Sequence, residues 1–200
     1  MKKHICVFCG SRDGDNLDTI AKASDLGRDL ANAGYGIVFG GGRLGLMGAV
    51  ARSAIGVGGS VIGIIPTGLT AREPVQQELS ELFVVDDIIE RKRLMMEKSD
   101  AFVVLPGGFG TLDELMEVLT LVQTGKSRKI PIILVGTKFW SGMIAWFRET
   151  LISEGLISPD DMDLIQLTDE PEEVVAAIFK YYETRGFELS ATDLKKQLYL

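Results

Sequence analysis

Histidine and cysteine, which often bind zinc or act as nucleophiles, are scarce in this chain of 200 residues, which has one histidine and two cysteines. Cys6 and Cys9 form a C-x-x-C pair, but no second cysteine pair exists and His4 is the single histidine. A zinc site built from these residues, and a Ser-His or Cys-His nucleophile, are therefore not expected. The two cysteines fall in a predicted buried strand, where positions three apart face opposite sides.

Long apolar runs and an excess of positive charge are also lacking. No segment has the roughly 18 consecutive apolar residues of a membrane-spanning helix, and the apolar run 5–9 is shorter than the core of a signal peptide. We therefore expect a cytoplasmic protein with no membrane partner. The formal net charge is -7 and no basic stripe is present, so a nucleic-acid partner is not expected either.

Short apolar segments alternate with helical patterns along the chain. The predicted strands cover 4–9, 36–39, 60–65, 82–85, 101–105, 131–135 and 164–167. The predicted helices cover 17–33, 45–57, 86–98, 111–124, 139–154 and 171–184. This alternation, with nearly continuous apolar strands, predicts an α/β fold with a Rossmann-like doubly wound parallel sheet. We expect a single domain over 1–185 and a C-terminal tail over 186–200.

Ligands of such sheets bind beyond the C-terminal ends of the strands, where loops 10–15, 40–45 and 106–110 fall. In the second loop Gly40, Gly42 and Gly45 fit G-x-G-x-x-G. A dinucleotide site also needs an acid about 20 residues further on, and none follows, which disfavours a dinucleotide oxidoreductase. Two interpretations remain open, a phosphate site made of backbone N–H groups and a tight turn that packs the helix closely.

The third loop opens the stretch PGGFGTLDE, residues 106–114. Its three glycines allow several N–H groups to surround one anion. Thr111 and Glu114 have the spacing of a capping box, so Glu114 either caps the helix or serves a ligand. Because Asp113 and Glu114 would repel a phosphate, we expect a ligand with a phosphate at one end and a polar, electron-poor region at the other.

The segment 86–100 predicts a helix that carries cations. Its apolar arc is formed by Ile88, Ile89, Met95 and Met96. Lys92 falls near the middle of this arc and Arg91 at its edge. Either Lys92 lies along apolar surface with its charge in water, or it points with Arg91 into a site. Arg93 is expected on the solvated face.

These motifs together resemble those of the LOG (Lonely Guy) family. PGGFGTLDE is similar to its PGGxGTxxE motif and ERKRLM to its upstream Arg-Lys pair, while GGGRLGLMG and VFCGS are similar to its other glycine loop and opening strand. The resemblance covers about residues 4–183. It implies a cytokinin riboside 5'-monophosphate phosphoribohydrolase, a homodimer without metal or cofactor that releases the base from N6-modified AMP. Many such enzymes also accept AMP and act as AMP nucleosidases.

The matched motifs imply that Arg91 and Glu114 are catalytic. The implied nucleotide contacts are Glu73, Arg91, Lys92, Gly107, Gly108, Phe109, Gly110, Thr111, Leu112, Asp113, Glu114, Glu117 and Thr120. The loops expected to hold phosphate or base add Gly10, Ser11, Gly41, Gly42, Gly45, Met47 and Gly48. Proteins of this family are often labelled lysine decarboxylases, but no pyridoxal-lysine context is seen.

Glycosidic bond cleavage builds positive charge on the sugar, which a carboxylate such as Glu114 stabilises. Arg91 would anchor phosphate or ribose and orient Glu114, since a guanidinium is a poor proton donor. The alternative is a non-catalytic protein of the same fold that binds a nucleotide or a molybdenum cofactor. The presence of both Arg91 and Glu114 favours the hydrolase.

Overall fold

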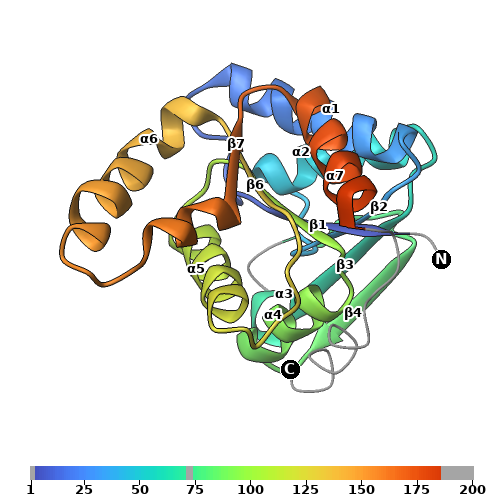
Figure 1. Ribbon diagram of the computed structural model, residues 1–200. Coiled ribbons are helices and arrows are strands. Elements are labelled where there is room, and N and C mark those ends of the chain that lie inside the picture. The colour runs from blue at the N-terminus through green and yellow to red at the C-terminus, as the bar shows by residue number, and fades with distance from the viewer. Residues whose placement is uncertain (1–2, 71–73, 186–200) are drawn as a thin grey trace.

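The computed structural model describes residues 3–70 and 74–185, and in that part of the chain seven strands form one parallel sheet (Figure 1). The strands are β1 His4–Phe8, β2 Gly36–Phe39, β3 Val61–Pro66, β4 Glu81–Val85, β5 Ala101–Val104, β6 Ile132–Val135 and β7 Ile165–Thr168. Their order is β4-β3-β2-β1-β5-β6-β7, and Val7 of β1 is in register with Phe39 of β2 and Val103 of β5. The predicted doubly wound parallel sheet is confirmed.

Helices cover both faces of the sheet (Figure 1). They are α1 Leu17–Asn32, α2 Gly45–Gly56, α3 Thr67–Thr70, α4 Ile88–Glu97, α5 Phe109–Gln123, α6 Thr137–Trp146 and α7 Pro171–Arg185. One core lies between the sheet and α1, α2 and α7, and the other lies between the sheet and α4, α5 and α6. Within the described residues, no helix has both the length and the apolar character needed to cross a membrane.

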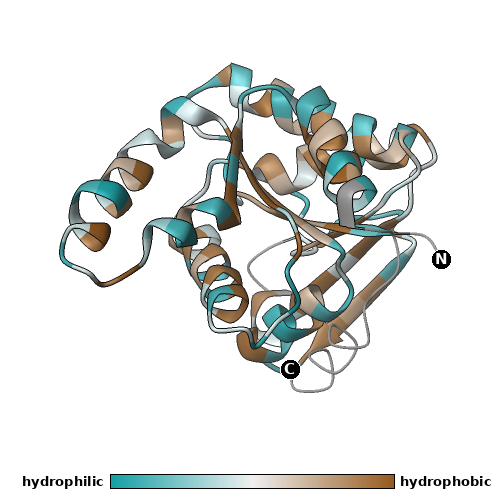
Figure 2. Ribbon diagram, in the orientation of Figure 1, coloured by the Kyte–Doolittle hydropathy of each residue, from teal (hydrophilic) through white to brown (hydrophobic). Residues whose placement is uncertain are grey.

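The central strands are buried on both faces, which explains their nearly continuous apolar sequence. Because successive side chains alternate in direction, Ile5 and Val7 belong to the first core and Cys6 and Phe8 to the second. Figure 2 shows the same strands as predominantly apolar. Cys6 and Cys9 lie in opposite cores as free thiols, in agreement with the predicted strand geometry.

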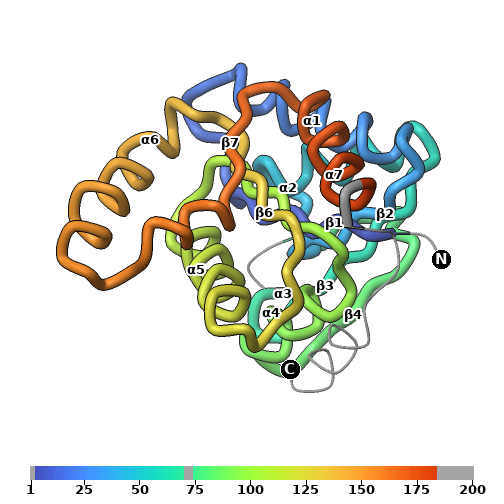
Figure 3. The backbone as a smooth tube through the Cα atoms, viewed as in Figure 1, coloured from blue at the N-terminus to red at the C-terminus, as the bar shows by residue number. Residues whose placement is uncertain are grey.

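The predicted elements match the observed ones closely, with differences where helices are short or irregular. The sequence did not predict α3 or the 3-10 helix Pro159–Leu164, because segments this short show no helical periodicity. The predicted helix 139–154 begins at Thr137 and continues beyond α6 as the π-helix Phe147–Ile152. In Figure 3, α6 and the segment that follows extend away from the sheet.

The strand order reverses between β1 and β5, which are neighbours at the centre of the sheet. The chain leaves β1 toward α1 on one face and leaves β5 toward α5 on the other, so the two loops diverge. Divergent loops at such a switch point leave a crevice at the C-terminal edge of the sheet. The predicted tail 186–200 lies outside the described residues.

Candidate functional site

A cavity of about 760 Å³ opens at this crevice. Its wall combines the loop after β1, the ends of β1 and β2, the loop after β5, and the first turns of α2 and α5. Of the predicted site residues, the cavity is lined by Gly10, Ser11, Met47, Arg91, Gly107, Gly108, Phe109, Gly110, Thr111 and Glu114. Four segments far apart in the sequence therefore meet at one site.

Arg91 reaches this cavity from the first turn of α4, and its side chain is buried. Its Nε donates to the carbonyl of Ile64 at 3.1 Å, and one terminal nitrogen donates to the carbonyl of Gly40 at 3.0 Å. A Cβ on residue 40 would lie 1.9 Å from that nitrogen, so only glycine leaves room for the guanidinium. The ends of β2 and β3 thus fix the catalytic candidate in place.

Glu114 faces Arg91 from the second turn of α5, and only 11% of its side chain is exposed. The second terminal nitrogen of Arg91 lies 4.0 Å from the Oε1 atom of Glu114. This distance is longer than a hydrogen bond, so the two groups attract each other across a gap. A ligand atom or a water molecule that enters the gap can contact both.

The environment of Glu114 favours its protonated form. Burial raises the pKa of the Glu114 carboxyl to about 7, while the positive charge of Arg91 opposes this rise. The negative charges of Asp113 and Glu117 raise the pKa further, and Lys92 lowers it. A carboxyl group with a pKa near 7 exchanges protons readily at neutral pH, as general acid-base catalysis requires.

The start of α5 corrects the predicted capping box. Gly108 is the N-cap, the helix begins at Phe109, and Thr111 is its buried third residue. A Cβ on Gly107 would lie 2.1 Å from the Thr111 hydroxyl, which shows how closely Thr111 packs on the glycine turn. Thr111 is therefore not the N-cap, and Glu114 is free to face the cavity.

The first turn of α5 is suited to bind an anion. No described side chain caps it, and Gly108, Phe109, Gly110 and Thr111 all line the cavity. The first N–H groups of a helix have no partner within the helix, and the helix dipole adds partial positive charge there. A phosphate would be held at this point without the help of a metal.

The glycine loop after β2 serves mostly to pack the backbone. Gly45 has a φ of +62°, and its Cβ would lie 2.3 Å from the backbone of Ser11. A Cβ on Gly48 would lie 1.8 Å from the carbonyl oxygen of Arg43. The interpretation as a close-packed turn thus holds for these two glycines. A second cavity of about 220 Å³ next to it is lined by Ser11, Arg12, Gly42, Arg43, Leu44, Met47 and Pro74.

Several predicted residues lie away from the main cavity. Its lining does not include Lys92, Leu112, Asp113, Glu117, Thr120, Gly41, Gly42, Gly45 or Gly48, and Glu73 lies outside the described residues. Leu112 packs against the second core, and the Thr120 hydroxyl donates to the carbonyl of Met116. Arg93 is exposed, as predicted, and pairs with Glu90 and Glu97.

Lys92 corresponds to neither of the two predictions made for it. Its amine lies 2.9 Å from a carboxylate oxygen of Asp113 and 2.7 Å from one of Glu117. The apolar arc around it is also divided, because Ile88 and Ile89 are exposed whereas Met95 is buried.

Part of the cavity wall was not among the individually predicted site residues. These residues are Val7, Cys9, Arg12, Asp13, Gly14, Asp15, Asn16, Thr19, Gly40, Leu46, Pro106 and Phe139. The signal for the polar ones was the loop GSRDGD at the end of the first predicted strand. No sequence pattern indicated that Phe139 lines the cavity, because it comes from α6 and belongs to no motif. Within the described residues, no group of three or more His, Cys, Asp and Glu could hold a metal ion.

Comparison with known sequences identifies relatives over nearly the whole chain. A family model described as "Possible lysine decarboxylase" matches residues 47–178. Cytokinin riboside 5'-monophosphate phosphoribohydrolase LOG1 of Arabidopsis thaliana is 37% identical over 179 residues, which cover 90% of this chain and 84% of that protein. The enzyme with the same activity name from Rhodococcoides fascians is 37% identical over 177 residues, 88% of this chain and 89% of its own.

Solved structures share the fold at lower identity. The molybdenum cofactor carrier protein of Chlamydomonas reinhardtii aligns with a TM-score of 0.70 and 19% identity, over 92% of this chain and 99% of that chain. The molybdenum cofactor binding protein of Rippkaea orientalis aligns with a TM-score of 0.68 and 22% identity, over 90% and 98% of the two chains. At these identities the likeness concerns the fold alone.

Proposed function

Because the chain belongs to the LOG family of cytokinin riboside 5'-monophosphate phosphoribohydrolases, we propose that it hydrolyses the N-glycosidic bond of N6-modified adenosine 5'-monophosphates. The products are the free base and ribose 5-phosphate. The observation that carries the proposal is the facing of Arg91 and Glu114 beside the uncapped first turn of α5. One cavity thus offers a carboxylate, a fixed cation and an anion cradle.

The 5'-phosphate binds at the first turn of α5, where Gly108, Phe109, Gly110 and Thr111 offer backbone N–H groups. Gly10 and Ser11 line the cavity beside this turn. Holding the phosphate at a fixed point directs the ribose toward Glu114, one turn deeper along the helix. A riboside without the phosphate loses this positioning and is expected to be a poor substrate.

Glu114 acts in its ionised form. As the bond between the ribose C1' and the base nitrogen breaks, positive charge develops on the ribose and the carboxylate stabilises it. Glu114 accepts a proton from the attacking water, whose oxygen bonds to C1'. The electron pair of the broken bond leaves with the base, which takes up a proton from solvent and departs neutral, and Glu114 then returns its own proton to solvent. Arg91 stays charged throughout, and its free terminal nitrogen contacts ribose or phosphate and orients Glu114.

We extend the proposal to AMP itself as a second substrate and to a homodimer. Support for the homodimer comes from the edge strand β4 and the start of α4, which expose Leu82, Val84, Ile88 and Ile89. Apolar side chains gathered at an edge are typical of a subunit contact. The molar mass of Val84→Glu/Ile89→Glu, measured by light scattering against wild type, tests the dimer. Fractionation of cells that produce the chain tests the predicted cytoplasmic location.

A product assay tests the function directly. The protein is incubated with N6-isopentenyl-AMP, AMP, GMP, CMP and N6-isopentenyladenosine, and the released base is measured by liquid chromatography. We expect base from the first two, and little from the unphosphorylated riboside. Release of no base from any monophosphate would overturn the proposal. The alternative of a non-catalytic carrier has support from the fold alone, and nucleotide retained through purification without turnover would favour it.

A further inference from the structure

Lys92 lies between α4 and α5 and bridges them outside the cavity. Its amine is 2.9 Å from Asp113 and 2.7 Å from Glu117, and 14% of its side chain is exposed. Burial lowers the pKa of Lys92, but the contacts with Glu117 and Asp113 outweigh this and keep its pKa above the usual value. The amine is therefore charged, and it forms ion pairs with two carboxylates.

The two partners of Lys92 flank Glu114 on α5. Asp113 directly precedes Glu114, and Glu117 follows one turn later, where side chains at i and i+3 are neighbours. Without a cation between them, two negative charges would stand beside the carboxylate that the reaction needs in ionised form. Negative charges close to the Glu114 carboxyl group disfavour its ionised form.

The other charged and titratable groups around Glu114 do not replace Lys92. Arg91 from α4 faces Glu114 across the cavity, where it also has to serve the ligand. From β1, the thiol of Cys6 and the nearby Cys9 are buried, and burial raises the pKa of both, so they stay neutral. The cavity loop contributes Arg12, Asp13 and Asp15, which are exposed to solvent and thus screened.

We propose that Lys92 is a positioning residue that acts through Asp113 and Glu117, holding both carboxylates outside the cavity and offsetting part of their negative charge, so that a larger share of Glu114 is ionised at neutral pH than would be without Lys92. The inference rests on the proposed function, because it assigns a role to the ionised carboxylate. Lys92 differs in this from Arg91, the residue before it. The 100° turn between them directs Arg91 into the cavity and Lys92 toward α5.

Opposite shifts in the pH profile of kcat/KM test the proposal. Lys92→Met leaves two uncompensated acids, so the acidic limb is expected to move up by about one pH unit relative to wild type. Asp113→Asn/Glu117→Gln with Lys92 kept is expected to move it down. The triple variant removes one positive and two negative charges, so its limb is expected to lie between those of the double variant and wild type, well below that of Lys92→Met. Arg93→Met, on the exposed face of the same helix, is the matched control and leaves the limb in place.

The outcomes separate this role from the alternatives. If Lys92 contacts the substrate phosphate, Lys92→Met raises KM without moving the limb, and neutralising the acids restores nothing; that result overturns the proposal. If Lys92→Met does not fold, the double variant still decides, since an unmoved limb contradicts the role. Carbon-13 NMR titration of the Glu114 carboxyl in the same variants needs no substrate. It therefore tests the coupling even where no hydrolysis is observed and the proposed function fails.

Discussion

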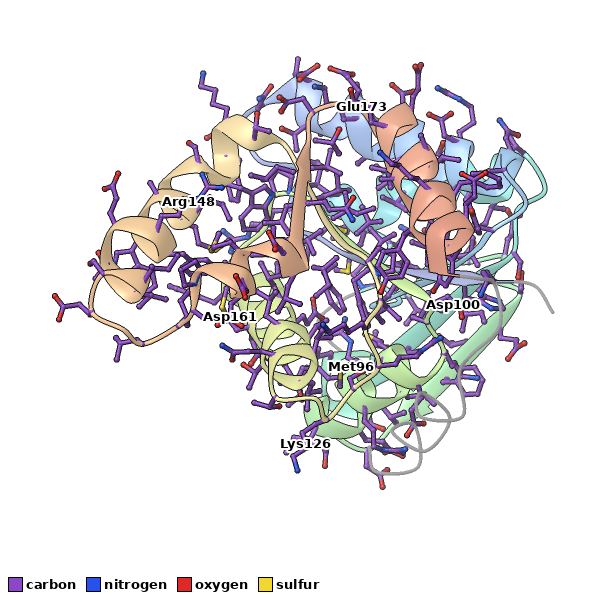
Figure 4. All side chains as sticks on the ribbon, in the orientation of Figure 1. Met96, Asp100, Lys126, Arg148, Asp161 and Glu173 are labelled. Carbon is purple, nitrogen blue, oxygen red and sulfur yellow. The ribbon has the colours of Figure 1, made fainter. Side chains whose placement is uncertain are left out.

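Arg91 lies at the C-terminal edge of the sheet and Arg128 at the N-terminal edge, and both are buried beside a carboxylate. Arg128 donates to the carbonyl of Ser99 at 2.6 Å and to Asp100 at 3.2 Å. Asp100 also accepts the backbone N–H of His4 at 2.9 Å. Figure 4 labels Asp100 near the C-terminal end of α7, whose Tyr182 donates to the Asp100 carbonyl. This cluster is closed by direct hydrogen bonds.

The pair of Arg91 and Glu114 is built differently. Two nitrogens of Arg91 donate to backbone carbonyls, one in β3 and one directly after β2, and 4.0 Å separates its remaining nitrogen from Glu114. Buried polar groups are normally satisfied within the protein, and a buried charged pair that stays open stands ready for a ligand. An arginine beside a carboxylate thus stabilises one edge of the sheet and lines the proposed reaction site at the other.

Removing the carboxylate from the open pair is expected to have the largest effect. Glu114→Gln keeps the size of the side chain but can neither accept a proton nor stabilise positive charge. We expect kcat to fall on the order of 10³-fold to 10⁴-fold while nucleotide binding persists. Release of base from the monophosphate, with calorimetric binding as the control, measures the change. Turnover at the wild-type rate would place catalysis elsewhere.

Breaking the closed cluster is expected to affect stability instead. Arg128→Met removes the nearer cation from the half-buried Asp100, which keeps only the Lys3 amine at 3.7 Å, and it leaves the Ser99 carbonyl without this donor. We expect a cost of about 2 kcal/mol in the free energy of unfolding. Urea denaturation measures this loss. Because the cluster lies at the far edge of the sheet, kcat of the folded fraction should be unchanged, and a catalytic defect would contradict the division between the two edges.

The open pair should also make stability depend on pH. Burial raises the pKa of Glu114 from 4.5 to about 7 in the folded state, although the charge of Arg91 opposes the rise. The folded protein therefore binds more protons than the unfolded chain between these values, and stability falls as pH rises through this window. We expect roughly 2 kcal/mol more loss from pH 5 to pH 8 in wild type than in Glu114→Gln. Parallel curves for the two proteins would show that Glu114 titrates normally.

A smaller effect is expected at Gly40. In Gly40→Ala the new methyl group occupies the place of an Arg91 nitrogen and displaces the guanidinium. We expect roughly tenfold lower kcat/KM, since a small misplacement weakens orientation without removing a catalytic group. Gly56→Ala is the matched control, because a Cβ at that position meets nothing within 4 Å.

The sequence predicted the sheet, because strands buried on both faces are local patterns. The pairing of Arg91 with Glu114 was implied by the resemblance of two compact motifs to those of the LOG family. It did not predict the role of Gly40, which depends on an arginine 51 residues further along the chain. Thr111 was misread as an N-cap because the glycine turn lets α5 begin two residues earlier. The ion pairs of Lys92 depend on how α4 packs against α5, and the place of Phe139 in the cavity wall depends on how α6 packs. Local sequence patterns do not determine how separate helices pack.

The two backbone bonds of Arg91 also bear on the order in which the protein folds. They join positions 27 and 51 residues apart, at the ends of two strands that must already be paired. The guanidinium has no fixed place before β2 and β3 are docked, because one acceptor lies in β3 and the other directly follows β2. During refolding, activity should therefore return only when the central sheet is complete. Partly folded chains should not hydrolyse nucleotides.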